Sequence, residues 1–271
     1  RELRYPASSF LKLAVAQLPA ERDAETAAAI SAHLRTTYTR YLSDKARAQA
    51  APEVENLFID QLQKAPTADL RITYFRGLVS IATSPRARDV LKDLFAGHMA
   101  IPDVPLKQRD RWNIIAALMA EGDPSARELL DTEARRDTSL DGRRYAFVAA
   151  AAAGTAENKK KFFTDYTGNS SLAEDWITAS LPYFNRWDQT ELTLPWLKPA
   201  LDALPQMKRE KKIFFVLDWL DDFVDSQNSA AALKVVDDAL AANAADPDLR
   251  LKILEVRDEL ARTVRIRTGA R

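Results

Sequence analysis

The segment from Lys208 to Asp225 carries an unusually wide apolar face for a single helix. At 100° per residue, its apolar side chains sweep an arc of roughly 200°, about twice the stripe of an ordinary surface helix. These side chains are Ile213, Phe215, Val216, Leu217, Trp219, Leu220, Phe223 and Val224. A helix with such an arc packs against neighbours on two sides, so the segment predicts an inner helix of a helical stack.

Helical periodicity continues along the rest of the chain, and most of the 13 Pro residues separate the periodic segments. Period-two alternation of β-branched residues is not sustained, which argues against a sheet. The pattern predicts a lead-in segment over residues 1–20, with a short helix from Ser8 to Leu18, and helix pairs from about 21 to 267. The expected helices cover 21–42, 50–65, 67–81, 107–119, 140–152, 155–166, 171–184, 187–204, 208–225, 228–242 and 247–267, with two more starting at Pro85 and Pro124.

Two short stretches, Ser84–Leu91 and Asp123–Leu130, repeat at a distance of 39 residues. Each places an N-cap residue first, Pro at the first helical position and an apolar pair one turn inside. Helix pairs that recur at this period are typical of an α-solenoid, although any two helices that start with Pro look alike. No Pro/Gly/Ser-rich linker divides the chain. The sequence therefore predicts a single all-α domain over residues 1–271, an α-solenoid or superhelix of antiparallel helix pairs of the HEAT or armadillo kind.

Composition limits the classes of partner. Lys+Arg and Asp+Glu both number 39, and a net charge of zero removes the basic footprint of a dedicated nucleic-acid-binding protein. No apolar run reaches the roughly 18 residues of a membrane span. The chain has no Cys, so disulfides and thiolate metal sites are excluded. We expect no nucleic-acid and no membrane partner, while proteins, peptides and small molecules stay open, and the compartment stays unknown.

The start of the chain is unusual for a translation product. It opens at Arg1, its first Met is Met99, and no charged-then-apolar signal segment precedes the first helix. We therefore expect a piece of a longer protein, in which the residues that carry the chemistry could precede Arg1.

The two histidines are weak candidates for a metal site. His33 lies in the middle of a predicted helix, and His98 follows Gly97 at a predicted helix end, where His is a common capping residue. Neither belongs to a His-Glu-x-x-His motif, and a catalytic zinc needs three protein ligands. We assign no metal ligand in this chain.

Four aspartates share the polar side of the wide apolar segment: Asp218, Asp221, Asp222 and Asp225. They could hold Ca²⁺ or meet a basic partner, but a calcium loop needs a non-helical turn with Gly and a distal Glu. The pattern favours a solvated face, so replacing Asp222 by Ala should leave stability nearly unchanged. Two other acidic pairs are also interpreted as surface charge rather than as acid–base pairs: Glu174 with Asp175, and Glu255 with Glu259.

Basic residues gather in four clusters: Arg135-Arg136, Arg143-Arg144, Lys159–Lys161 and Lys208–Lys212. Phe162 and Phe163 adjoin the third cluster, which could suggest base stacking, but the zero net charge favours Phe in the core and Lys on the rim. The five Trp residues are interpreted as core: Trp112, Trp176, Trp187, Trp196 and Trp219. No Gly-x-Ser-x-Gly, phosphate-binding Gly loop or Gly-x-Gly-x-x-Gly motif is present, so we assign no catalytic or cofactor-binding residue.

Several stretches, spread over nearly the whole chain, match a known family. They are Phe10–Leu13 leading into Gln17–Glu21, Asp110–Ile115, Phe184-Asn185 with Gln189 and Leu192, Lys212–Leu220, and Leu249–Arg267. The last of these is similar to the closing helix of the bacterial zinc aminopeptidases of the aminopeptidase N family. Together the stretches resemble the C-terminal domain of that family.

The resemblance implies a HEAT-like bowl of paired helices, the last domain of a larger enzyme that removes N-terminal amino acids from peptides. In that family the bowl packs over the zinc-bearing catalytic domain and limits which peptides enter its cavity. The family's His-Glu-x-x-His helix, Gly-x-Met-Glu-Asn strand and β-rich N-terminal domain are missing here. The implied partners are therefore the catalytic and β-rich domains of the same parent protein and a peptide substrate. Zinc is expected in the missing catalytic domain, and no cofactor in this chain.

Two functions of different classes stay open. The first is the non-catalytic C-terminal domain of a zinc aminopeptidase, which caps the catalytic domain and gates peptide access. The second is an autonomous helical-repeat scaffold that binds another protein. A His-Glu-x-x-His motif in the reading frame upstream of Arg1 would favour the first, and its absence would favour the second.

Overall fold

The computed structural model of the chain describes residues 5–169, 171–242 and 246–269. These residues form fifteen α-helices, one 3-10 turn and two π-helical turns, and their only β pairing is an isolated bridge between Ile101 and Val104. The predicted all-α class is confirmed. The chain divides into two compact units, residues 1–123 (unit 1) and 124–271 (unit 2), and each is described by itself. The single domain and the bowl stay predictions, and residues 1–4 of the predicted lead-in lie outside the described residues.

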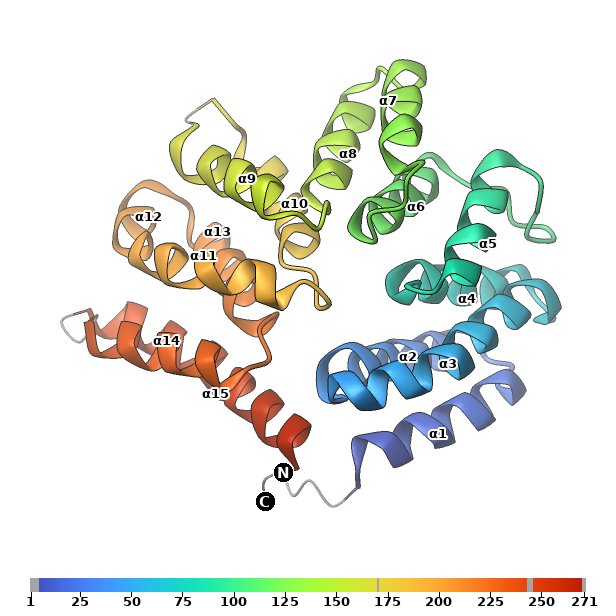
Figure 1. Cartoon of the computed structure of the whole chain (residues 1–271), viewed down its shortest axis with the longest axis horizontal. Coiled ribbons are helices and arrows are strands. Elements are labelled where there is room, and N and C mark those ends of the chain that lie inside the picture. The colour runs from blue at the N-terminus through green and yellow to red at the C-terminus, as the bar shows by residue number, and fades with distance from the viewer. Residues whose placement is uncertain (1–4, 170, 243–245, 270–271) are drawn as a thin grey trace. The chain divides into compact units, whose positions relative to one another are not determined.

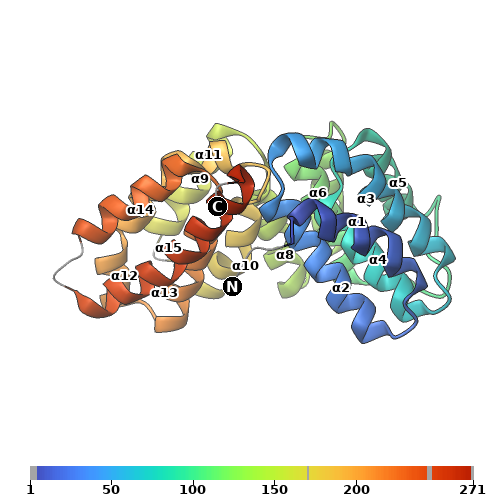
Figure 2. The same cartoon turned by 90° about the horizontal axis from the view of Figure 1, so that it is seen from below.

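Unit 1 is built from consecutive helices that pack side by side (Figures 1 and 2). Its elements are α1 (Ala7–Gln17), the 3-10 turn η1 (Leu18–Ala20), α2 (Ala24–Thr36), the π-helical turn η2 (Thr37–Tyr41), α3 (Asp44–Lys64), α4 (Ala68–Ile81), α5 (Pro85–Ala96) and α6 (Gln108–Ala120). The helix α4 packs against both α2 and α3, while α5 packs against α6. The predicted helix pairing is therefore present in this unit.

Local capping signals set most helix ends in unit 1. The side chains of Thr67 and Ser84 each accept a hydrogen bond from the backbone N–H three residues further on, at the starts of α4 and α5. Gly97 ends α5 with a φ of 80°, a left-handed conformation that glycine adopts without steric penalty. These ends lie where the sequence predicts them.

The start of α3 differs from the prediction, which places it at Ala50 just before Pro52. The helix begins at Asp44, because Ser43 accepts a hydrogen bond from the N–H of Ala46, and Pro52 lies inside it. Buried Arg47 also secures the first turn by donating to Asp44 Oδ1 at 2.6 Å. These contacts offset the one helical hydrogen bond that a proline removes.

The helices α3 and α4 lie close together at Gly77. A Cβ at this position would lie 2.3 Å from Cε1 of the buried Phe58 ring. We expect Gly77→Ala to lower the free energy of unfolding by about 1–3 kcal/mol, because the added methyl group overpacks this contact. Urea denaturation would measure the change, and Gly168→Ala, at the open end of a helix, is the matched control. Equal stability of Gly77→Ala and the unmodified chain would contradict the close contact.

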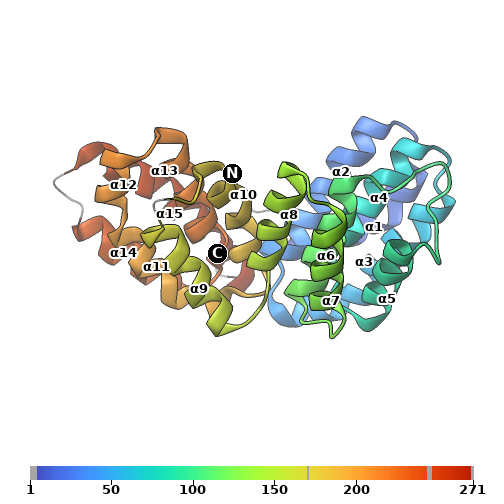
Figure 3. The ribbon, with the colours of Figure 1, turned by 90° about the horizontal axis from the view of Figure 1, so that it is seen from above.

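Unit 2 contains nine α-helices among its described residues (Figures 1 and 3). They are α7 (Ala126–Arg136), α8 (Leu140–Ala151), α9 (Ala156–Gly168), α10 (Glu174–Phe184), α11 (Thr190–Asp202), α12 (Leu204–Glu210), α13 (Ile213–Leu220), α14 (Ala230–Ala242) and α15 (Pro247–Thr268), with the π-helical turn η3 (Asp221–Asp225) after α13. The helix α8 packs against α7 and α10, and α14 packs against α11 and α15. Packing of helices against their neighbours thus also organises this unit.

The start of α7 lies two residues beyond the predicted position. The sequence places Asp123 at the N-cap, whereas the N-cap residue is Ser125 and the helix begins at Ala126. The carboxylate of buried Asp123 instead lies 3.4 Å from Lys92 Nζ, an ion pair that ties the residue to α5.

The segment over 208–225 is not one helix. Lys211 and Lys212 are extended, with ψ angles of 159° and 149°, and separate α12 from α13. Basic residues at 208, 211 and 212 would repel one another at the i,i+3 and i,i+4 positions of a continuous helix. The break also allows separate ion pairs, because Lys208 binds Asp246 at 2.7 Å and Lys211 lies 3.6 Å from Glu174.

The apolar arc of this segment nevertheless forms the centre of the unit 2 core. Trp219 is fully buried, its ring centroid lies 4.5 Å from that of Phe223 and 6.0 Å from that of Phe215, and its Nε1 donates to the Ala200 carbonyl at 3.0 Å. The helix α13 contacts α10, α12 and α15, so the predicted inner position is confirmed. Among the eight apolar residues of the predicted arc, Leu217 is half-buried, and Ile213, at the first turn, is exposed.

Candidate functional site

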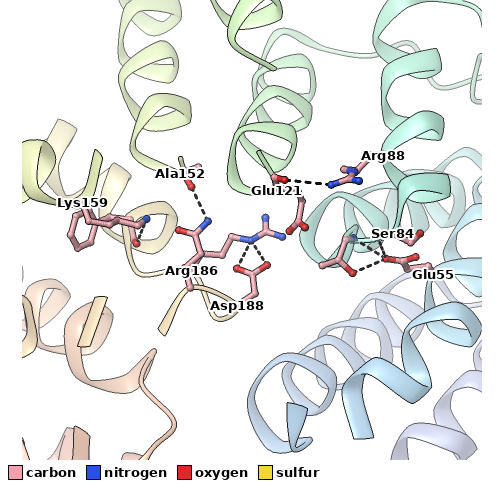
Figure 4. Close-up of polar contacts among 11 residues, drawn as sticks. Glu55, Ser84, Arg88, Glu121, Ala152, Lys159, Arg186 and Asp188 are labelled. Atoms are coloured by element: carbon pink, nitrogen blue, oxygen red, sulfur yellow. Dashed lines mark hydrogen bonds and ion pairs between the residues drawn. The ribbon is translucent and has the colours of Figure 1, made fainter. Parts of the chain in front are cut away.

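Buried polar side chains secure the connections between successive helices, and in unit 1 two residues do this (Figure 4). The carboxylate of Glu55 on α3 accepts hydrogen bonds from the backbone N–H groups of Thr83 and Ser84 at 2.8 and 3.0 Å. The guanidinium of Arg88 on α5 donates to the Glu121 carbonyl at 3.4 Å. Both contacts attach one helix to the turn that leads into a later helix, so their role is structural.

Unit 2 has a denser cluster of buried and half-buried polar side chains, which we name the α8–α11 junction: Lys159, Asn185, Arg186, Asp188 and Gln189. Figure 4 labels Lys159, Arg186 and Asp188 of this cluster. Thr155 caps α9, which places Lys159 in the first turns of that helix. The Lys159 side chain is 0% exposed, and its ammonium donates to the Phe184 carbonyl at 2.6 Å and the Ala151 carbonyl at 3.4 Å.

These two carbonyls belong to the last residues of α10 and α8. A cation at a helix C-terminus is favourable because the macrodipole and the unpaired carbonyls concentrate negative charge there. The ammonium group of Lys159 therefore connects the C-terminal ends of α8 and α10. Burial is the main reason that the pKa of Lys159 falls to about 7, the nearby charge of Asp188 opposes this change, and that of Arg186 adds to it.

The other members of the junction face the same helix ends. Gln189 donates from Nε2 to the Ala152 carbonyl at 3.0 Å, and Arg186 donates from Nε to both carboxylate oxygens of Asp188 at 2.9 Å. Asn185 is 2% exposed, and its side-chain amide has no hydrogen-bond partner among the described residues. A buried amide without a partner costs roughly 1–3 kcal/mol.

The side chains of the α8–α11 junction hold helices in position. It brings together an ammonium, an ion pair and two amides, with no hydroxyl or thiol nucleophile next to a base. Because the Lys159 side chain is fully buried, its ammonium binds helix ends and is not accessible to a substrate from solvent. We interpret the junction as the element that sets the spacing of α8, α9, α10 and α11.

A pocket lies in unit 1, between the end of α5 and the loop that leads to α6. This pocket has a volume of about 290 Å³ and is mostly apolar, with Phe95, Met99, Ile101 and Val104 among its lining residues. Arg111 at its edge stacks 4.0 Å over the Phe95 ring and donates to the Phe95 carbonyl at 3.0 Å. Arg111, the only basic residue that lines the pocket, thus binds Phe95 of the pocket wall.

The sequence interpretation was wrong for Lys159, which it placed on the rim with Lys160 and Lys161. Those two are exposed, and Lys161 pairs with Asp165 at 2.7 Å. Lys159, in contrast, shares a stripe at i, i+3, i+4 and i+7 with the buried aromatic residues Phe162, Phe163 and Tyr166. That spacing is the signal that could have identified it. The expectation that Phe162 and Phe163 lie in the core is confirmed.

The prediction that the four aspartates form a solvated face is also partly wrong. Asp221 is exposed, but Asp218, Asp222 and Asp225 are half-buried. Burial, followed by the neighbouring carboxylates, raises the pKa of Asp222 to about 8. Asp222 and Asp225 lie in the π-helical turn Asp221–Asp225, which departs from the 100° per residue that the prediction assumed.

The remaining charged candidates lie at the surface in ordinary ion pairs or backbone contacts. Asp175 lies 3.9 Å from Arg144, Glu259 binds Arg262 at 2.6 Å, and Arg136 lies 3.4 Å from Glu133. The interpretation of the acidic pairs as surface charge agrees with these contacts. Trp112 and Trp219 are core residues as predicted, whereas the other three tryptophans are half-buried: Trp176, Trp187 and Trp196.

Neither histidine belongs to a group of three potential metal ligands among the described residues. His33 is exposed in the last turn of α2, and His98 Nδ1 lies 3.6 Å from Asp93. Within the described part of the chain, no group of three or more His, Cys, Asp or Glu side chains is arranged to hold a metal ion. A search of the same residues finds no helix with the length and apolar character needed to cross a membrane.

A comparison with protein-family models identifies the family of this chain. The family model described as the ERAP1-like C-terminal domain matches residues 1–262, which is nearly the whole chain. This confirms the resemblance to the C-terminal domain of aminopeptidases. No curated protein matches the sequence.

Proposed function

We propose that this chain, which belongs to the ERAP1-like C-terminal domain family of aminopeptidases, is the non-catalytic C-terminal domain of a zinc aminopeptidase. In this role it caps the catalytic domain of the parent enzyme and shapes the access of peptides to its cavity. The parent reaction is the removal of N-terminal amino acids from peptides. The observation that carries the proposal is the family match over residues 1–262.

The buried polar contacts support a capping role. Glu55, Arg88, Lys159 and Gln189 each attach a helix to a turn or to a helix end elsewhere in the same unit. Contacts of this kind stiffen a helical stack, because each one satisfies backbone groups that the end of a helix leaves unpaired. A stiff wall can exclude peptides of the wrong shape or length, whereas a loose one would let them pass.

The described residues do not fit a zinc ion. No three candidate ligands come together among them, and both histidines are exposed. We therefore place the zinc of the parent enzyme in its catalytic domain and derive no step of the reaction through a metal in this chain.

The purified chain is expected to contain no stoichiometric zinc and to leave aminoacyl chromogenic substrates intact. Elemental analysis and a hydrolysis assay with added Zn²⁺ measure the two properties. The parent protein, assayed in parallel, is expected to hydrolyse the same substrates. Metal-dependent turnover by the isolated chain would overturn the proposal, and so would a parent without aminopeptidase activity.

The alternative is an autonomous helical-repeat scaffold that binds another protein. The observation in its favour is the exposed apolar pair at the start of α13, where Phe214 is 75% and Ile213 is 46% exposed. The reading frame upstream of residue 1 distinguishes the two functions, because only the aminopeptidase requires a zinc-binding His-Glu-x-x-His motif there.

A further inference from the structure

The outward side of α13 carries an exposed apolar patch. Phe214 and its neighbour Ile213 are exposed, and Leu217, one turn further on, is half-buried. At 100° per residue, Phe214 and Leu217 point away from the buried side of the helix, which carries Trp219. Neighbouring exposed apolar side chains of this size are typical of a surface that contacts another molecule.

The residues that precede this patch are basic. Arg209 and Lys212 are exposed, and neither forms an ion pair within the part of the chain that the structure describes. Glu210 lies between them in sequence, and its carboxylate accepts hydrogen bonds from Gln206 Nε2 at 3.0 and 3.1 Å. The start of the patch therefore presents basic side chains that are available to a carboxylate of another molecule.

The residues that follow the patch are acidic. Asp218, Asp221 and Asp225 recur at spacings of three and four, at which like charges repel each other on a helix. Glu255 adds a further negative charge from α15, which packs against α13 and η3 (Figure 2). Burial, followed by the charges of these three neighbours, raises the pKa of Asp221, and no basic side chain lowers it. The Asp221 carboxylate is therefore not neutralised within the described part of the chain.

This order of charges makes the face complementary to itself. When two copies of the face meet antiparallel, the basic start of each lies opposite the acidic end of the other. A two-fold axis at the level of Val216 would place Phe214 of each copy against Leu217 of the other, and Lys212 of each copy close to Asp221 of the other. Every contact of such an isologous interface occurs twice, so one type of charge pair contributes two ion pairs.

We propose that the outward face of α13 and η3 is the interface of a two-fold symmetric homodimer of this chain, closed by Phe214 and by ion pairs between Lys212 and Asp221. The inference goes beyond the proposed function and does not rest on it, because it uses only the exposure and charge of this face. The charges favour the antiparallel arrangement over a parallel one, in which acidic ends would face each other. Two helix faces bury a small area, so we expect a weak dimer with a dissociation constant of roughly 10–100 μM.

Sedimentation velocity of the purified chain tests the dimer. The sedimentation coefficient is expected to rise with protein concentration from that of a monomer to that of a dimer. Added NaCl is expected to raise the dissociation constant, because salt screens ion pairs between exposed groups. A chain that stays monomeric at concentrations far above the expected dissociation constant would overturn the inference.

Charge reversal tests the pairing of the two ends. Lys212→Glu and Asp221→Lys are each expected to raise the dissociation constant at least about tenfold, because each places like charges opposite one another at two symmetric positions. The double variant restores opposite charges in the reverse order and is expected to dimerise like the unmodified chain. A double variant that dimerises as weakly as the single variants would overturn the inference.

A second substitution tests the apolar contact. Phe214→Ser is expected to leave the chain monomeric over the same range of concentration. Leu13→Ser is the matched control, because it removes an exposed apolar side chain from α1 in the other unit, and it is expected to leave the dissociation constant unchanged. All these variants are expected to unfold at nearly the urea concentration of the unmodified chain, since the substituted side chains are exposed. Equal dimerisation of the Phe214→Ser and Leu13→Ser variants would overturn the inference.

The parent protein distinguishes a second copy from a contact within one molecule. The parent is expected to dimerise as well, and Phe214→Ser is expected to make it monomeric. A monomeric unmodified parent would overturn the inference, and slower hydrogen exchange of α13 in that parent than in the monomeric Phe214→Ser chain would assign the face to another part of the same protein. A parent that dimerises through this face but lacks aminopeptidase activity would overturn the proposed function alone.

Discussion

Trp219→Ala is expected to lower the free energy of unfolding of the chain by ~3–5 kcal/mol, as large aromatic truncations in packed cores do. The residue is fully buried among Phe163, Phe215 and Phe223, so its removal leaves a cavity that rigid neighbours cannot fill. The substitution also leaves the Ala200 carbonyl, which accepts the indole N–H at 3.0 Å, without this partner. Urea denaturation followed by circular dichroism would measure the loss.

Asp222→Asn is the matched control, because it lies one turn away on the same segment. Burial and the neighbouring carboxylates raise the pKa of Asp222 from 3.8 to about 8, so ionisation of this residue in the unfolded chain lowers stability at neutral pH. Asp222→Asn removes this ionisation and is therefore expected to keep or raise stability. The sequence analysis also predicted a nearly neutral substitution at Asp222, but on the assumption of a solvated side chain, whereas the side chain is half-buried. Equal losses of stability in both variants would mean that α13 is oriented differently from the structure described.

Lys159→Met is expected to remove a pH-dependent component of stability. The pKa of Lys159 is about 7 in the folded chain and its ordinary value is 10.5, so the unfolded chain binds more protons between these two values. Stability therefore rises with pH through this window, and the penalty for burying the ammonium is complete below pH 7. From pH 6 to pH 9 the contribution amounts to roughly 2–3 kcal/mol.

Urea denaturation of both proteins at pH 6, 7.5 and 9 would test this expectation. Methionine fills a similar volume without a charge, so the stability of the variant relative to the unmodified chain is expected to decrease as pH rises. Lys160→Met, at the exposed neighbouring position, is the control and should keep the pH profile of the unmodified chain. A pH profile that Lys159→Met does not alter would contradict the assignment of the rise to this residue.

The α8–α11 junction shows how far the sequence alone leads toward the candidate site. The stretch Phe184-Asn185 with Gln189 contributed to the family resemblance, and the structure places these residues at the ends of α10 and α11. Their sequence neighbours do not reveal that the Phe184 carbonyl meets Lys159, 25 residues earlier. That contact requires knowledge of which helix ends come together, and this information is not local.

The sequence by itself determined the helical class, the family and most helix ends. Caps such as Ser84 and Asp246 act on backbone groups within one turn, so their effect can be read from neighbouring residues. The wide apolar arc likewise determined that Trp219 is buried, because no single neighbour could cover it.

Only the tertiary structure decided the break at Lys211 and Lys212, the burial of Lys159 and the raised pKa of Asp222. Each depends on a helix that is distant in sequence, because ion pairing and desolvation are properties of the assembled core.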